Sequence, residues 1–134
     1  MKVVRYYEYG DPQVMRYEDA EQPRLTAGQA LIRVAATSFN AVAVAIRAGA
    51  LRQAFPVRFP HTPGIDVAGT VAALSEGVTG FTVGDAVIGF LPMNENGAAA
   101  EFVAAPANVL AAAPRRVPLT TAALPHLCAT GGTP

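Results

Sequence analysis

The chain has 134 residues, enough for one domain with a single hydrophobic core. Its 10 lysine and arginine residues balance its 10 aspartate and glutamate residues, so no positive excess favours nucleic acid as a partner. The one cysteine, Cys128, excludes a disulfide framework and any metal site built from several cysteines of this chain. No signal-peptide pattern opens the chain, and no apolar run approaches the roughly 20 residues that span a bilayer. We therefore expect a soluble cytoplasmic protein with no membrane partner.

The first third of the chain predicts three strands separated by turn residues. Alternating residue types indicate strands over 2–7 and 14–18, with the turn Gly10-Asp11-Pro12 between them. Proline and glycine mark 21–28 as a polar connection. Residues 29–36 then predict a strand with two largely apolar faces, as in a barrel strand covered on one side by another element.

A short helix is predicted over 41–49, where alanine is abundant. Valine and isoleucine limit it to one or two turns. Asn40 or Ser38 is suited to cap its N-terminus, and Gly49 is suited to end it. Residues 51–60 are predicted to be irregular, because two prolines exclude a long helix there.

The stretch 61–90, HTPGIDVAGTVAALSEGVTGFTVGDAVIGF, predicts a sharply bent hairpin. Small or polar residues alternate with apolar ones over 64–72, as in a half-buried strand. The turn over 75–80 contains two glycines that tolerate positive φ. The apolar run 86–90 is the expected return strand.

Beyond the hairpin, strands are expected over 98–104 and 109–113, parted by Pro106. Residues 117–124 are typical of the start of a helix. At least six short strands with few helical turns predict a mainly β fold, a partly open β-barrel with a few short helices.

The hairpin also carries a family pattern. Residues 63–87 follow PGxDxxGxVxxxGxGVxxFxxGDxV, except that Ser75 replaces the first glycine of the turn. This pattern resembles the N-terminal, GroES-like domain of the medium-chain dehydrogenase/reductase superfamily. The closer resemblance is to its zinc-independent, NADPH-dependent quinone oxidoreductase-like branch, and it extends from Met1 to about Leu124. The resemblance implies a GroES-like domain over 1–124.

The resemblance also implies roles for two polar residues. In the quinone reductases, the asparagine matching Asn40 faces the cleft where nicotinamide and substrate meet. Asn40 is therefore expected to contact the cofactor and to act in catalysis, because an amide both donates and accepts hydrogen bonds. An N-cap role is the alternative and is compatible with it. Arg47 is expected to act in catalysis by reaching an anionic or carbonyl group at the cleft, the alternative being a solvated or aspartate-paired surface arginine.

Asp66 matches a carboxylate that the family keeps near the cleft, which implies a role in binding substrate. Alternatively, it only accepts hydrogen bonds from backbone amides of its strand. Two positions depart from the family: Ala43 replaces an aspartate that could relay a proton, and Ala50 replaces a tyrosine. A quinone reductase depends less on such groups, because the cofactor supplies the hydride and water can protonate a quinol oxygen.

No zinc site is expected. Zinc alcohol dehydrogenases carry a cysteine at the position of Asn40 and His-Glu at the position of Ile65-Asp66. A catalytic zinc needs about three protein ligands, and the four-cysteine structural lobe of those enzymes has no counterpart here. His61 is interpreted as a loop residue beside prolines rather than as a metal ligand.

In this superfamily the cofactor is held by a Rossmann domain, whose glycine-rich turn binds the pyrophosphate. The sequence reaches Pro134 before any such unit, and Gly131-Gly132 follows no predicted strand and opens no helix. The resemblance also stops at 125–134, which is expected to be an irregular tail. We hypothesise that this tail arises from a shifted reading frame or a truncated gene.

Two function classes follow from the sequence. The first is the substrate-side domain of an NADPH-dependent quinone or enone oxidoreductase, which transfers hydride and is incomplete without a Rossmann domain. The second is a stand-alone GroES-like module that binds a protein or a small apolar ligand without catalysis. In the second case, an exposed apolar surface is expected to be covered by self-association into a homo-oligomer. The sequence leaves open whether the chain alone is an enzyme.

Overall fold

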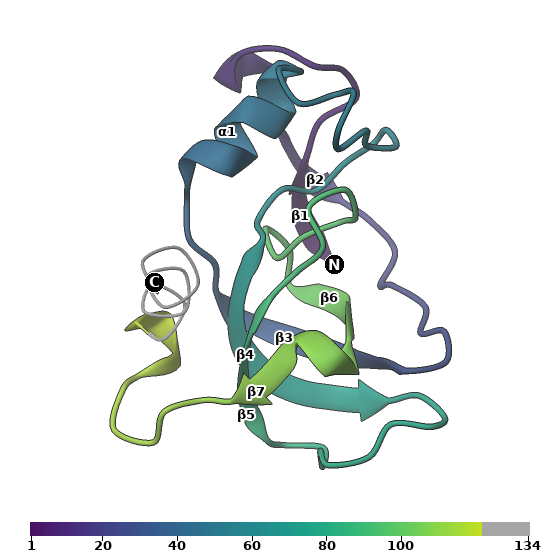
Figure 1. Cartoon of the computed structure of the whole chain (residues 1–134), viewed down its shortest axis with the longest axis vertical. Coiled ribbons are helices and arrows are strands. Elements are labelled where there is room, and N and C mark those ends of the chain that lie inside the picture. The colour runs from purple at the N-terminus through teal and green to yellow at the C-terminus, as the bar shows by residue number, and fades with distance from the viewer. Residues whose placement is uncertain (122–134) are drawn as a thin grey trace.

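The computed structural model describes residues 1–121, which form two antiparallel sheets and one eight-residue helix (Figure 1). The helix α1 spans Ala41–Ala48, and two short 3₁₀ turns span Pro12–Val14 and Ala107–Val109. The strands are β1 Lys2–Arg5, β2 Arg16–Asp19, β3 Gln29–Ala36, β4 Asp66–Leu74, β5 Ala86–Phe90, β6 Phe102–Pro106 and β7 Leu110–Ala112.

The larger sheet has the strand order β6-β3-β4-β5-β7, and the smaller sheet pairs β1 with β2. The two end strands of the larger sheet, β6 and β7, are not paired with each other, so the sheet curves without closing. The predicted mainly β, partly open barrel is thereby confirmed. Helix α1 lies at one end of the molecule, beyond the ends of β3 and β4 (Figure 1).

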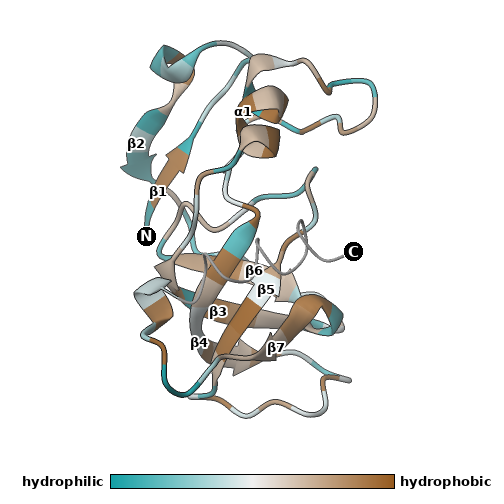
Figure 2. Ribbon diagram, turned by 60° about the vertical axis from the view of Figure 1, so that its left-hand side comes forward, coloured by the Kyte–Doolittle hydropathy of each residue, from teal (hydrophilic) through white to brown (hydrophobic). Residues whose placement is uncertain are grey.

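The hydrophobic core lies on one face of the larger sheet. On β4, Val67 and Val71 point into the core, whereas Ala68 between them packs on the opposite face, as the two-residue period of a strand requires. The residues buried in the core are Ala30, Ile32, Val67, Val71, Val87, Leu91, Ala98, Val103, Ala105 and Leu110. Figure 2 shows the hydrophobic colouring of β3, β4 and β5, in contrast with the hydrophilic β2.

Gly69 explains how β4 bends against β3. The register between these strands shifts at this point, because Val34 pairs with Gly69 and Ala36 pairs with Ala68. A Cβ atom on Gly69 would collide with the backbone carbonyl of Arg33. Glycine is therefore needed here for close backbone approach, as expected for a glycine inside a strand.

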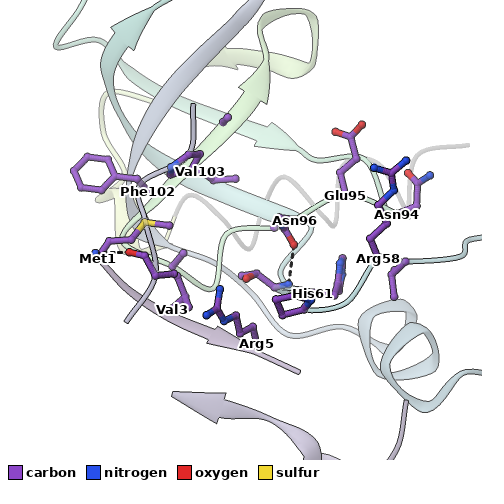
Figure 3. Close-up of a pocket in the computed structure, with 18 of the residues that line it drawn as sticks. Met1, Val3, Arg5, Arg58, His61, Asn94, Glu95, Asn96, Phe102 and Val103 are labelled. Carbon is purple, nitrogen blue, oxygen red and sulfur yellow. Dashed lines mark hydrogen bonds between the residues drawn. The ribbon is translucent and has the colours of Figure 1, made fainter. Parts of the chain in front are cut away.

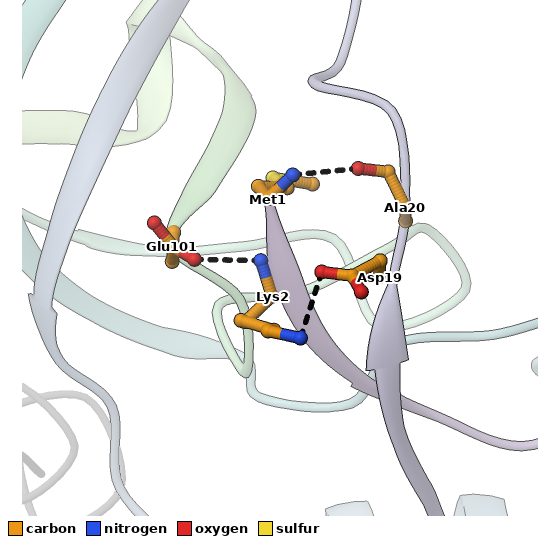
Figure 4. Close-up of polar contacts among 5 residues, drawn as sticks. All are labelled: Met1, Lys2, Asp19, Ala20 and Glu101. Atoms are coloured by element: carbon orange, nitrogen blue, oxygen red, sulfur yellow. Dashed lines mark hydrogen bonds and ion pairs between the residues drawn. The ribbon is translucent and has the colours of Figure 1, made fainter.

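The N-terminal hairpin is attached to the larger sheet by polar contacts at its start (Figure 4). The backbone N–H of Lys2 donates to Oε1 of Glu101 at 2.6 Å, and its ammonium lies 2.9 Å from Oδ1 of Asp19. The N-terminal ammonium of Met1 donates to the carbonyl of Ala20 at 2.8 Å. These contacts hold β1 and β2 together and anchor β1 beside β6.

Most of the predicted elements are present, and β3 has the predicted bounds. The strand expected over 98–104 is wrong in its first half. Ala98 and Ala99 instead donate backbone hydrogen bonds to the carbonyls of Gly64 and Pro63, at 2.7 and 3.0 Å. Pro106 ends β6, where an edge strand tolerates a residue without an N–H.

Other boundaries also differ from those predicted. The strands expected over 2–7 and 109–113 are shorter, at Lys2–Arg5 and Leu110–Ala112. The strand expected over 14–18 begins at Arg16, because Pro12–Val14 forms a 3₁₀ turn capped by the side chain of Asp11. The strand expected over 64–72 is displaced by two residues, to Asp66–Leu74. A helical turn begins at Leu119, but the rest of that segment and the expected tail over 125–134 lie outside the described residues.

Candidate functional site

The candidate site forms where β3 ends, α1 begins and β4 begins. Asn40 has extended backbone, and its Oδ1 accepts a hydrogen bond from the N–H of Ala43 at 3.0 Å. At the other end, Gly49 adopts φ +87° and its N–H donates to the carbonyls of Ala45 and Ile46. The predicted N-cap role of Asn40 and the end of the helix at Gly49 are confirmed, and together they define a two-turn helix.

Asp66, the first residue of β4, is completely buried. Its Oδ2 accepts hydrogen bonds from the hydroxyl of Ser38 at 2.7 Å and from Nδ2 of Asn40 at 3.3 Å. Its other carboxylate oxygen, Oδ1, is buried without a hydrogen-bond partner in the described residues. The alternative that this carboxylate bonds only to strand amides is therefore wrong, because both of its donors are side chains. We refer to Ser38, Asn40 and Asp66 as the polar cluster.

Close packing of the backbone brings the members of the polar cluster together. Gly64 has φ +103°, and a Cβ there would lie 2.8 Å from Oγ1 of Thr37 and 3.0 Å from the backbone nitrogen of Ala98. Oγ1 of Thr37 also donates to the carbonyl of Asp66 at 2.6 Å. Only glycine fits this position easily, and the result is that the start of β4 lies directly beside the end of β3.

Arg47 is buried, with 6% of its surface exposed, so the alternative of a solvated surface arginine is wrong. Its Nε donates to the carbonyl of Gly10 at 3.3 Å, and the N–H of Gly10 donates back to the carbonyl of Arg47 at 3.0 Å. This reciprocal pair attaches α1 to the turn after β1. Arg47 also borders a small hollow with Ser38, Phe39 and Met15.

Apolar side chains are exposed next to the polar cluster. The surface of Phe39 is 73% exposed, although it lies between two polar cluster residues in the sequence. Val44, Ala41 and Ala48 on α1 are also exposed. Helix α1 carries no charged residue other than the buried Arg47. We refer to Phe39, Ala41, Val44 and Ala48 as the apolar strip, which gives α1 no polar outer face of the kind that a surface helix normally has.

A second hollow, of about 820 Å³, is shown in Figure 3. It is bordered by β1, the segment before β4 and the loop before β6, and Arg58, Glu95 and Asn96 are among its lining residues. Neither Asn40 nor Asp66 lines it. It is therefore separate from the polar cluster.

His61 lies in the wall of this second hollow, and only 4% of its surface is exposed. It exchanges backbone hydrogen bonds with Tyr6 at 2.9 and 3.0 Å, and the two rings meet edge to face, with centroids 5.4 Å apart. Burial lowers the pKa of His61 to about 4 and raises the pKa of Tyr6 to about 12. His61 is thus a buried residue that joins the N-terminal hairpin to the larger sheet.

Comparison with known proteins decides the family. Residues 26–115 match the family model described as the alcohol dehydrogenase GroES-like domain. The chain belongs to this family. The match includes β3, α1, the whole polar cluster and β4 to β7.

Among the relatives of this GroES-like domain are quinone oxidoreductases from plants and animals. It is 32% identical over 118 residues to the chloroplastic quinone-oxidoreductase homolog of Spinacia oleracea, covering 87% of this chain and 36% of the relative. It is 36% identical over 103 residues to the quinone oxidoreductase of Rattus norvegicus, covering 76% and 30%. The chain thus spans about a third of the length of these relatives. It is a quinone oxidoreductase-like member of the medium-chain dehydrogenase/reductase superfamily.

A solved structure shows the same fold. A mycobacterial protein in complex with NADPH superposes on this chain with a TM-score of 0.81 and 32% sequence identity. The superposition covers 100% of this chain and 42% of the mycobacterial chain. Within residues 1–121, no three histidine, cysteine, aspartate or glutamate side chains are grouped to hold a metal ion. None of the helical segments in the same range has the length and apolar character of a membrane span.

Sequence reasoning named Asn40 and Asp66 as site residues of this GroES-like domain but considered Ser38 only as a helix cap. The structure brings these three residues together, whereas Arg47 forms its hydrogen bond on Gly10 instead. One signal could have identified Ser38. It lies two residues before Asn40, and side chains two apart in extended backbone point to the same side.

Proposed function

We propose that this GroES-like domain forms the substrate-side wall of a quinone or enone oxidoreductase that uses NADPH. The observation that carries the proposal is the half-buried amide of Asn40, which is held at the junction of β3, α1 and β4 beside the exposed apolar strip. A polar donor next to an exposed apolar surface suits a flat, apolar ligand with carbonyl oxygens. The names of the quinone oxidoreductase relatives support the same substrate class.

The described residues fit one part of an NADPH site. Asn40 offers an N–H that could bond a ribose hydroxyl as an alternative to the substrate oxygen. The segment between β3 and α1, which spans 37–40, contains no glycine, so within residues 1–121 it is not the glycine-rich turn that holds a pyrophosphate. In this proposal, a dinucleotide-binding domain such as those of the longer relatives supplies that contact.

In the proposed reaction, bound NADPH supplies a hydride, and the quinone becomes a quinol after it also takes up a proton. Asn40 donates a hydrogen bond to the substrate oxygen on which negative charge develops, which stabilises that charge. Phe39 and Val44 exclude water from one side of the substrate. Ala43 provides no proton, so solvent is the proton source in this proposal.

A domain exchange tests this function. Residues 1–124 would replace the corresponding N-terminal domain of the rat quinone oxidoreductase, and NADPH oxidation would be measured with a soluble quinone. We expect quinone-dependent turnover above that of the remaining rat domain alone. The change Asn40→Ala should lower kcat/KM by roughly 10- to 100-fold, whereas Asn108→Ala, at an exposed asparagine outside the site, should not. A chimera that folds and binds NADPH but reduces no quinone contradicts the proposal.

The apolar strip supports a second candidate, a binding module that associates with itself. Phe39 is 73% exposed and Val44 is 39% exposed, and an uncharged helix face of this kind is normally covered in a soluble protein. Sedimentation of the 134-residue chain over a hundredfold range of concentration would detect such association. Phe39→Asp should abolish it, and a chain that stays monomeric throughout would exclude this candidate.

A further inference from the structure

We propose that Ser38 and Asp66 are positioning residues, which hold the Asn40 amide in one orientation so that it presents a single N–H donor to its ligand. This inference rests on the proposed function, because it concerns the residue that would meet the substrate. It adds two residues to the site and defines the chemistry of the ligand atom: a hydrogen-bond acceptor, such as the carbonyl oxygen of a quinone or an enone.

Both ends of the Asn40 amide are occupied within the protein. Its Oδ1 accepts from the N–H of Ala43 at 3.0 Å, and its Nδ2 donates to Oδ2 of Asp66 at 3.3 Å. Rotating the amide by 180° would bring its NH₂ group against the Ala43 N–H and its oxygen against the Asp66 carboxylate. Both contacts would then be repulsive, because two donors and two acceptors would face each other. The amide therefore has one favourable orientation.

The carboxylate that selects this orientation is itself held in place. A carboxylate accepts but does not donate, so the 2.7 Å contact with Ser38 is a hydrogen bond from the hydroxyl to Oδ2 of Asp66. Oγ1 of Thr37 fixes the backbone of the same residue through the carbonyl of Asp66. Ser38 is 7% exposed and Asp66 is fully buried. Water therefore competes little for these bonds.

Burial also determines which residue meets the ligand. Asp66 has no exposed surface, and Ser38 has almost none. Neither side chain is placed to touch a substrate, whereas Asn40 is half-buried. The role of Asp66 in substrate binding is thus indirect and acts through Asn40.

The donor count follows from these contacts. An asparagine amide has two N–H bonds, and Asp66 accepts one of them. The second N–H has no partner within residues 1–121 and is free for a ligand. The amide oxygen is already bonded to the N–H of Ala43. A ligand group that accepts a hydrogen bond is therefore preferred over one that only donates.

The test uses nuclear magnetic resonance on the ¹⁵N-labelled 134-residue chain without any ligand. In the wild type, the heteronuclear NOE of the Asn40 side-chain amide should match that of the ordered backbone, whereas the exposed Asn94 should show the low value of a mobile side chain. Two variants test the positioning role: Ser38→Ala, and Asp66→Leu, which removes the acceptor at similar size. In both, the NOE of the Asn40 side-chain amide should fall to the low value of Asn94, and its chemical shifts should move toward those of Asn94. Ser75→Ala should leave the Asn40 amide unchanged.

Ser75 is a matched control because its hydroxyl is also part-buried and donates at 2.8 Å, to the carbonyl of Gln29. It lies at the far end of β4, outside the polar cluster. If Ser38 and Asp66 only stabilise the fold, their variants will melt at lower temperature while the Asn40 amide keeps its NOE and shift, and the proposal is overturned. A mobile Asn40 amide in the wild type overturns it without any variant.

This measurement is independent of turnover. An ordered Asn40 amide that loosens in both variants supports the positioning role even if the rat chimera is inactive, in which case only the proposed reaction fails. If the chimera is active but the Asn40 amide is mobile, the proposed reaction is supported and the positioning role of Ser38 and Asp66 fails. If Asp66→Leu does not fold, Ser38→Ala and the wild-type NOE still decide the question.

Discussion

The buried His61 predicts that the domain loses stability between pH 7 and pH 5. Burial lowers its pKa from 6.5 to about 4 in the folded state. Between these two values the unfolded chain binds a proton that the folded chain does not, so stability falls as the pH falls. From the two pKa values, His61 contributes a loss of about 2 kcal/mol between pH 7 and pH 5, and about 3 kcal/mol in total below pH 4.

The loss should be local as well as global. The backbone of His61 exchanges two hydrogen bonds with Tyr6 and thereby connects β1 to the segment before β4. A proton on the His61 ring would place a charge in a site that is 96% buried, beside the Tyr6 ring. We expect the protection of the Tyr6 backbone amide against hydrogen exchange, corrected for the intrinsic exchange rate at each pH, to be much lower at pH 5 than at pH 7.

The assay is urea unfolding at pH 7 and pH 5 for the wild type and for His61→Gln, which is polar but does not titrate. The carboxylates and His126 are present in both proteins, so their contributions cancel in the difference between them. The stability lost from pH 7 to pH 5 should be about 2 kcal/mol smaller in the variant. An equal loss in both proteins would refute the assignment of this pH dependence to His61.

Two further predictions concern single positions in the fold. Gly69→Ala should destabilise the domain by about 3 kcal/mol or more, because the new Cβ would meet the Arg33 carbonyl. Thermal unfolding measures this loss. Gly77→Ala separates the two causes of strain, because a Cβ at Gly77 would meet no atom within 4 Å and only the positive φ of Gly77 would oppose it. Tyr6→Phe should keep or raise stability, because the Tyr6 hydroxyl is buried with no hydrogen-bond partner in the described residues. A loss above about 1 kcal/mol in urea unfolding would mean that the hydroxyl has a partner, such as a buried water.

Local signals predicted the elements well where side chains interact with near neighbours. The alternation of apolar residues over 29–36 predicts β3 with the correct bounds. Gly49 predicts the end of α1, and Asn40 or Ser38 predicts its start, because capping depends on residues only a few positions away. The structure has Asn40 as the N-cap. The strand expected over 98–104 failed because Ala98 and Ala99 bond to a segment about 35 residues earlier, which no local pattern reports.

The sequence by itself determined the mainly β class, the helix with its caps, and the family resemblance that names Asn40 and Asp66. Only the tertiary structure decided which groups these side chains contact. The hydrogen bond from Ser38 to Asp66 joins residues 28 positions apart, and the burial of Arg47 depends on the turn that contains Gly10. Periodicity records which side of a strand or helix is apolar, but burial and hydrogen bonding depend on what the fold places opposite that side.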